Sequence, residues 1–323
     1  MIFPSFCGLD YFNIPFYNKV LQFVGYDSKM VVGKGELTYM NYLWIIFVII
    51  YSLLKGGREG MKKAALKRSS STEILFFYTL IGFILTIPFS HNVFDLEPIF
   101  IFWAFVKAAA VCIAWLFAFA ALKNMSVSLY GIMDLSRMIF STLLAVLVLG
   151  ETMTVPKILG VILVITGLLL VNFKKDTSSK GLTLIPLVAA LLNCFFNAIS
   201  GTMDKILMQY MESSQLQFWF MFFTALLYGI ILLAKKERIS VKSIKTNYWI
   251  PLMSASLILG DRLLFEANAY PGSEVTLMTI IKQSSVIVTV LTGWLVFKEK
   301  HILYKTMCAS IVVAGILIAT LWK

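Results

Sequence analysis

Residues 116–133 read LFAFAALKNMSVSLYGIM, and residues 264–281 read LFEANAYPGSEVTLMTII. The two stretches align without a gap at an offset of 148 residues, and the same offset pairs Glu151 with Glu299. Both copies lie in strongly apolar sequence. Two homologous halves of hydrophobic sequence are typical of secondary transporters, in which the binding site lies between the repeats.

The repeat extends upstream at an offset of 142 residues, where Lys63 aligns with Lys205 and Phe76 with Phe218. The composition places both halves in a lipid bilayer. The chain has 323 residues, of which 59% are hydrophobic and 14% charged, whereas a soluble globular protein has about 25% charged residues.

About 20 apolar residues are needed for a helix to cross the hydrocarbon layer of a membrane. We expect about ten such spans, approximately at 41–66, 73–90, 99–122, 127–149, 155–173, 183–209, 214–234, 248–269, 274–297 and 304–322. The predicted fold class is therefore an all-α integral membrane protein. Ten spans divide into five for each half, which agrees with the repeat.

The net charge of +11 does not indicate nucleic acid binding, because most Lys and Arg residues fall in short links between the spans, as expected for membrane proteins. Cys7, Cys112, Cys194 and Cys308 have no CxxC spacing, and three of them lie in apolar runs, where cysteine packs as a small hydrophobe. We expect no metal site, no disulfide framework and no cofactor.

Residues 1–39 mix aromatic and polar residues, contain no run long enough to span a membrane, and lie outside the repeat. Met40 directly precedes the first span, and the codons for Lys34-Gly35-Glu36 could form a bacterial ribosome-binding sequence. We therefore expect residues 1–39 to be a mis-called extension, with an interfacial arm as the alternative. The repeats would then cover 40–173 and 183–323.

The distribution of basic residues predicts an orientation. Links after the odd-numbered spans hold 18 Lys and Arg residues, and the other side holds at most five. The positive-inside rule then places those links in the cytoplasm and both termini outside. One alternative concerns the stretch KGGREGMKKAAL at 55–66, which could be the polar end of the first span, lining a cavity instead of forming a loop.

Ionisable residues inside the predicted spans are the candidate functional groups, because a charge at mid-bilayer costs about 2.5–3.5 kcal/mol even on insertion scales. Nine such residues occur beyond the links: Lys107, Asp134, Arg137, Asp204, Lys205, Asp261, Arg262, Glu266 and Lys282. Each is expected to pair with another group or to face water.

Asp134 and Arg137 are spaced i,i+3 and share one face of a helix, so they could form a structural clamp or contact substrate. Lys282 is the repeat equivalent of Asp134 and is followed by Gln283. A pseudo-two-fold axis would place Asp134 and Lys282 on opposite walls of one central space. The predicted cavity carries both signs of charge and suits a zwitterion or a polar metabolite, although a direct Asp134–Lys282 ion pair is an alternative.

The eighth span contains three more ionisable residues. Arg262 and Glu266 are spaced i,i+4 and are expected to pair, whereas Asp261 points elsewhere. An apolar wall disfavours the charged form of a carboxylate, so Asp261 or Glu266 could instead carry a coupling proton.

The remaining charges sit on the third and sixth spans. Lys107 has no local partner, and we expect it either to reach the interface or to meet Asp134. Asp204 and Lys205 are expected at the membrane interface. Small residues of the fifth and tenth spans, Gly167 and Gly315 among them, predict close helix packing.

The stretch from Phe117 to Val171 resembles part of the drug/metabolite transporter superfamily, of the EamA type. The residues that carry the resemblance are Ala121-Leu122 before a short turn, Ser126-Val127-Ser128 opening the fourth span, Leu149-Gly150-Glu151 at its end, and Gly160 and Gly167 in the fifth span. Phe297-Lys298-Glu299 and Gly315 mark a degraded second copy. The usual proline of the fourth span is absent after Arg137.

The resemblance implies ten helices in two inverted five-helix repeats around a central cavity, with transport of amino acids, drugs or other metabolites. It also implies cytoplasmic termini, in conflict with the charge distribution, so the orientation stays open.

The leading hypothesis is a secondary transporter of a small polar, amino-acid-like or drug-like metabolite in the cell (plasma or inner) membrane. Its substrate would be bound by Asp134, Arg137, Lys282, Gln283 and Lys107. A flippase for a lipid-linked substrate is the alternative. An intramembrane aspartyl protease is a further candidate, but its motif is incomplete, because Ile258-Leu259-Gly260-Asp261 lacks the first glycine of the pattern. A membrane scaffold that does not transport is the last candidate.

Overall fold

The computed structural model describes residues 43–90, 92–149, 154–173, 184–208, 210–236, 246–269 and 281–321. These residues belong to one compact unit that begins at Trp44, apart from Leu43. Its helices are α3 (Leu43–Ala65), α4 (Ser71–Thr86) with the 3₁₀ turn η1 (Ile87–Phe89), α5 (Pro98–Asn124), α6 (Val127–Asp134), α7 (Arg137–Leu149), α8 (Val155–Phe173), α9 (Leu184–Leu207), α10 (Ser213–Ala234), α12 (Trp249–Ala269), α14 (Ser285–Leu295) and α15 (Ile302–Leu321).

The helical elements coincide with the ten predicted spans, and the described residues contain no strand, so the all-α membrane fold is confirmed. Within the part of the chain that the structure describes, five segments are long and apolar enough to cross a membrane: Ser71–Phe89, Pro98–Asn124, Val127–Leu144, Leu184–Asp204 and Ser213–Ala234. Shorter apolar helices cover Val155–Leu170 and Ile302–Ile318. Ionisable residues interrupt the apolar sequence of α3 and α12, which makes these two helices more polar than their neighbours. The predicted extension over residues 1–39 lies outside the described residues.

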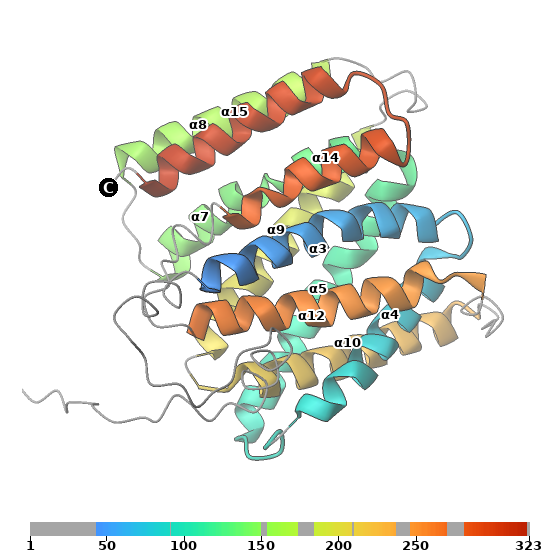
Figure 1. Cartoon of the computed structure of the whole chain (residues 1–323). Coiled ribbons are helices and arrows are strands. Elements are labelled where there is room, and N and C mark those ends of the chain that lie inside the picture. Colours follow the sequence, from blue (N-terminus) through green and yellow to red (C-terminus); the bar gives the residue numbers. More distant parts are fainter. Residues whose placement is uncertain are drawn as a thin grey trace, which may run out of the picture. The chain divides into compact units, whose positions relative to one another are not determined.

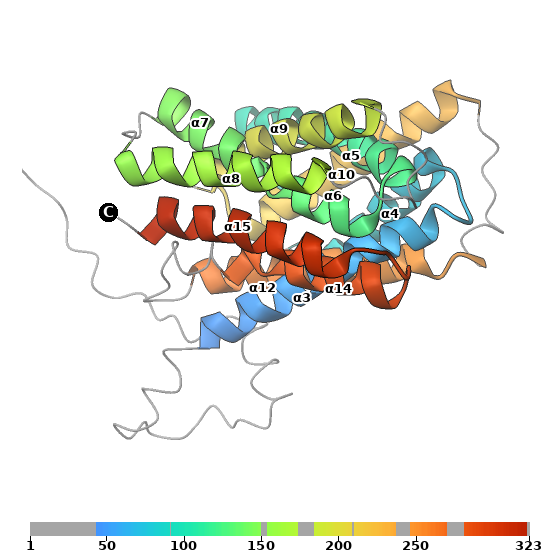
Figure 2. The ribbon, with the colours of Figure 1, turned by 90° about the horizontal axis from the view of Figure 1, so that it is seen from above.

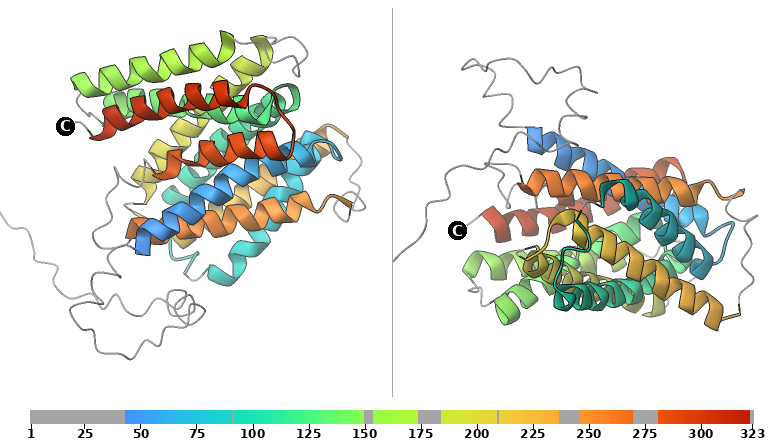
Figure 3. Two further views of the ribbon diagram at one scale, coloured as in Figure 1. Left: turned by 45° about the horizontal axis from the view of Figure 1, so that its top comes forward. Right: turned by 90° about the horizontal axis from the view of Figure 1, so that it is seen from below.

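The helices form two layers of five spans (Figures 1 and 2). One layer runs in the order α8, α6–α7, α9, α5 and α10, and the other runs α15, α14, α3, α12 and α4. Contacts between neighbours such as α7 and α9, or α12 and α4, hold each layer together. At the two edges the layers meet directly, through α8 against α15 and α4 against α10 (Figure 3).

Each layer combines three spans of one repeat with two of the other. The helices α5, α6–α7 and α8 of the first repeat share a layer with α9 and α10 of the second, and the converse holds for the other layer. Because each repeat crosses the membrane an odd number of times, the second copy starts on the opposite side and is inverted. The first two helices of each repeat lie in the layer formed by the last three spans of the other repeat. Each helix therefore faces its repeat equivalent in the opposite layer.

Glycines allow close contacts between helices, both between the two layers and within one layer. A Cβ atom at Gly315 in α15 would lie 2.7 Å from the carbonyl oxygen of Gly160 in α8, and one at Gly167 would lie 2.5 Å from Val312. The close packing predicted for these helices is therefore present. On α3, a Cβ atom at Gly56 would lie 2.5 Å from the carbonyl oxygen of Ser285, so α3 rests directly on the start of α14.

Of the four cysteines, Cys112, Cys194 and Cys308 are buried free thiols. They pack as small apolar side chains, as predicted. Among the described residues, no group of His, Cys, Asp and Glu is arranged to hold a metal ion.

Candidate functional site

The fourth span breaks in the middle. Helix α6 ends at Asp134 and α7 begins at Arg137, and the turn between them uses short i→i−3 hydrogen bonds, from Ser136 N to Met133 O at 3.0 Å and from Ile139 N to Ser136 O at 3.0 Å. The apolar run over 127–149 predicts one continuous span, without the usual proline, so this break was not predicted. It places the Asp134 and Arg137 side chains at the discontinuity.

The second repeat has the same break at the same register. Ser284 N donates to Ile281 O at 3.1 Å and Ile287 N donates to Ser284 O at 2.9 Å, and each atom lies 148 residues from its counterpart in the first repeat. The Ser284 hydroxyl also donates to Ile281 O at 2.6 Å, and such side-chain bonds compete with the helical ladder. Discontinuous helices of this kind surround the binding sites of many transporters.

The first helix of each repeat presents one polar face to the space between the layers. On α3 this stripe consists of Tyr51, Lys55, Arg58, Glu59 and Lys62. A spacing of i, i+4, i+7 and i+11 keeps such residues on one side of a helix. The equivalent stripe on α9, at an offset of 142, consists of Asn193, Asn197, Ser200, Gly201 and Asp204. The alternative for residues 55–66 is thereby confirmed, because this segment is helical and lines a cavity.

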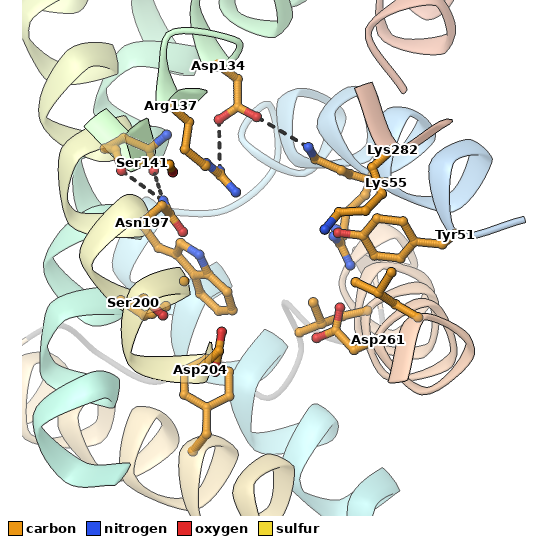
Figure 4. A pocket seen from close by; sticks show the side chains of 18 of the residues that line it. Tyr51, Lys55, Asp134, Arg137, Ser141, Asn197, Ser200, Asp204, Asp261 and Lys282 are labelled. Atoms are coloured by element: carbon orange, nitrogen blue, oxygen red, sulfur yellow. Dashed lines mark hydrogen bonds and ion pairs between the residues drawn. The ribbon is translucent and has the colours of Figure 1, made fainter. Parts of the chain in front are cut away.

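A cavity of about 500 Å³ lies between the two layers. In Figure 4, Arg137, Asn197 and Ser200 come from one layer and face Lys55 and Asp261 from the other. Trp115, Tyr78 and Phe220 add aromatic surface. This volume and this mixture of polar and aromatic groups suit a small-molecule ligand.

Asp134 is shared by two cations. Its carboxylate lies 3.0 Å from Arg137 Nη2 and 3.6 Å from Lys55 Nζ. The pairing of Asp134 with Arg137 agrees with their i,i+3 spacing. Lys282 and Gln283 also line the cavity, but among the described residues Lys282 forms no ion pair, so the direct Asp134–Lys282 bridge is not formed.

Lys107 is held by the second repeat. Its Nζ lies 3.1 Å from Asp204 Oδ1, donates to Ser200 Oγ at 2.8 Å, and sits 4.1 Å from the ring centroid of Phe220. Neither sequence-based alternative for Lys107, the interface or Asp134, is therefore correct. Asp204 was expected at the interface as well, and it lines the cavity because α9 carries its polar stripe to its last turns.

The two carboxylates of α12, Asp261 and Glu266, lie in different surroundings, as predicted, but the predicted ion pair of Glu266 with Arg262 is absent from the described residues. Asp261 lines the cavity, and no ion pair links it to a described residue. The guanidinium of Arg262 lies 5.2 Å from the ring centroid of Phe89. Among the described residues no ion pair joins Arg262 to Glu266, so the expected i,i+4 pair is not formed, and neither residue lines the cavity.

The start of α6 is bound by the opposite repeat. Glu299, which follows α14, accepts hydrogen bonds from Val127 N at 2.7 Å and Ser128 N at 3.3 Å, and its carboxylate lies 3.2 Å from Lys305 Nζ. Both charged side chains are only 6% exposed. Lys63 at the end of α3 donates to the carbonyl oxygens of Leu122 and Met125. These contacts close the bundle at the end that carries the basic links.

The sequence did not point to Asn197 or Gln217 as cavity residues, and it indicated Lys55 and Arg58 only as part of a segment that could line a cavity. The available signal was the i, i+4, i+7, i+11 spacing of polar residues at equivalent positions of α3 and α9. It was obscured because the α9 residues are mostly uncharged.

The model of the EamA-like transporter family matches this chain twice, over residues 35–173 and 184–321. The chain belongs to the EamA-like transporter family. The two matches follow the two sequence repeats, which confirms the resemblance to the drug/metabolite transporter superfamily. The family assignment makes the protein a multi-pass membrane protein of a transporter family and not a member of an enzyme family.

A solved structure described as "Crystal structure of protein" has the same fold, with a TM-score of 0.61. The similarity covers 85% of this chain and 95% of that one, at 13% sequence identity. Among curated protein sequences, none matches this EamA-like chain.

Proposed function

We propose that this EamA-like protein is a secondary transporter of a small polar metabolite in the cell membrane. The observation that carries the proposal is the charged cavity between two inverted repeats, placed where the fourth and ninth spans break at the same register. Asp134, Arg137, Lys282, Gln283 and Lys107 would bind the substrate, since all five line this cavity.

Alternating access would rock the two layers against each other around this site. The contacts of Glu299 with the start of α6 close one end of the bundle and would open when the cargo leaves through that end. Asp261 lacks an ion partner among the described residues and faces the cavity, so it is the carboxylate best placed to carry a coupling proton.

The test compares metabolites inside and outside cells that express the intact chain with those of cells that express Arg137→Gln at equal membrane abundance. Lys300→Gln is the matched control, since Lys300 is an exposed loop cation outside the cavity. A compound redistributed by the intact chain and by Lys300→Gln, but not by Arg137→Gln, would support the proposal and give the direction of transport.

Normal transport by Arg137→Gln would contradict the assignment of Arg137 to the binding site. No redistributed compound in any sample would contradict a soluble-metabolite transporter, and assays of lipid-linked substrates would then test the flippase alternative.

A further inference from the structure

We infer that the cargo is an organic anion, an inference that rests on the proposed function and narrows its substrate class. The cavity is lined by six basic side chains, which are Lys55, Arg58, Lys62, Lys107, Arg137 and Lys282. Its acidic side chains are four: Glu59, Asp134, Asp204 and Asp261. The lining therefore has an excess of two positive charges when all ten groups are ionised.

The ion pairs show where the excess lies. Lys62 is neutralised by Glu59 at 2.8 Å, and Lys107 by Asp204 at 3.1 Å. These two pairs leave four cations, Lys55, Arg58, Arg137 and Lys282, with two carboxylates, Asp134 and Asp261.

Asp134 alone serves both Arg137 and Lys55. Lys282 lines the same cavity from the layer opposite Asp134. Two cations therefore share a single carboxylate, and Lys282 has no ion partner among the described residues.

A second centre of positive charge is Arg58, on the same face of α3 as Lys55. Arg58 is 7% exposed, forms no ion pair with a described residue, and has a buried Nη1 atom without a hydrogen-bond partner. The Nε atom of Arg137 is also buried and has no hydrogen-bond partner. A buried cation is destabilising when its donors are left without acceptors, and an anion with two or more acceptor oxygens would accept hydrogen bonds from Arg58 Nη1 and Arg137 Nε.

The opposite wall favours uncharged polar groups of the same cargo. Where α3 carries Lys55 and Arg58, α9 carries Asn197 and Ser200 at the equivalent positions. Asn197 Nδ2 donates to Asn193 Oδ1 at 2.7 Å, so this wall is already hydrogen-bonded. Gln217 also lines the cavity, is 3% exposed and has no hydrogen-bond partner for either of its amide atoms, which provides a neutral donor and a neutral acceptor.

The charge of the cavity can be tested without knowing the cargo, because Trp115 lines it. The chain has seven tryptophans. The emission of Trp115 is obtained by subtracting the fluorescence of the Trp115→Phe variant from that of the purified full chain. Its quenching would be measured with iodide and with caesium, at constant ionic strength maintained with gluconate salts. We expect iodide to quench Trp115 on the order of tenfold more strongly than caesium, since a cleft lined by one sign of charge concentrates counter-ions.

The double variant Arg58→Gln/Lys282→Gln should reduce the iodide preference at least threefold, whereas Lys300→Gln should leave it unchanged. Equal quenching by the two ions, or an iodide preference that survives the double variant, would overturn the inference.

The metabolite comparison separates an organic cargo from a simple inorganic counter-ion. A redistributed compound with a net negative charge supports the inference. A neutral or cationic cargo overturns it even if iodide is preferred, and the excess cations then serve an inorganic anion. Absence of any redistributed compound would refute the proposed function instead, and an iodide preference would still assign an anion site to the cavity.

Discussion

Replacement of Glu299 by glutamine tests how the two repeats are joined. Glu299 accepts hydrogen bonds from Val127 N and Ser128 N, at 2.7 and 3.3 Å, and lies 3.2 Å from Lys305 Nζ. Lys305 in turn reaches Ser126 Oγ at 3.3 Å. One carboxylate therefore stabilises the partial positive charge at the start of α6 and neutralises a lysine of α15.

The expected cost follows from burial. The Glu299 and Lys305 side chains are each 6% exposed, and removal of one partner of a buried ion pair costs about 3–5 kcal/mol. Glutamine retains one oxygen that can accept from Val127 N, so we expect Glu299→Gln to lower the free energy of unfolding by about 3 kcal/mol. Lys305→Met should cost a similar amount. The double variant should lose about 1–3 kcal/mol less than the sum, because the two residues are in contact.

The measurement is the free energy of unfolding in mixed micelles, from denaturing-detergent titrations followed by circular dichroism. Lys300→Gln provides the control for loss of a loop charge near Glu299 and should change the stability by less than about 0.5 kcal/mol. A cost below about 1 kcal/mol for Glu299→Gln, or strictly additive costs, would refute the claim that this ion pair stabilises the contact of the second repeat with the start of α6.

Two further predictions concern packing and the cavity. Gly315→Leu should destabilise the protein by about 1–3 kcal/mol, because its Cβ would lie 2.7 Å from the carbonyl oxygen of Gly160; Gly201→Ala, with no atom within 4 Å of the new Cβ, should be tolerated, and equal thermal shifts would contradict this reasoning. Lys107→Met and Asp204→Asn should each reduce transport in proteoliposomes. The double variant should transport about tenfold faster than the product of the two single losses predicts, which corresponds to about 1.4 kcal/mol of coupling. A transport rate equal to that product would contradict the pairing.

The fold could be predicted from the sequence because each membrane span is marked by its own local run of apolar residues. Ten apolar runs and an internal repeat predict the number of spans and the five-plus-five division without any knowledge of tertiary contacts. The glycines at 167 and 315 likewise predicted a contact of one helix with another. What could not be predicted was the exchange of the first two helices between layers, since no local pattern specifies it.

The site could be predicted in part. The residues at the fourth and ninth spans, Asp134, Arg137 and Lys282, were found because a charge in an apolar run is conspicuous. Two ion pairs were not predicted, Lys55 with Asp134 and Lys107 with Asp204, because they join residues that are far apart in sequence. The repeat alignment predicted opposite walls for Asp134 and Lys282, but helical spacing within one repeat does not show which side chains meet across the cavity.

The backbone of the cavity is symmetric and its charges are not, and this contrast bears on mechanism. Asp134 is matched by Lys282, and Lys55 by Asn197, at equivalent positions of the two repeats. Because both repeats have a break at the same register, the protein could rock between two states in which the contacts of one repeat in the first state are made by the other repeat in the second state. Under the proposed function, a cargo bound between such walls would have one preferred orientation, because Lys55, Arg58 and Lys282 belong to one layer. The anionic end of the cargo should therefore keep its contacts with these three cations while the layers rock, and its contacts with Arg137 and the α9 wall are the ones exchanged during transport.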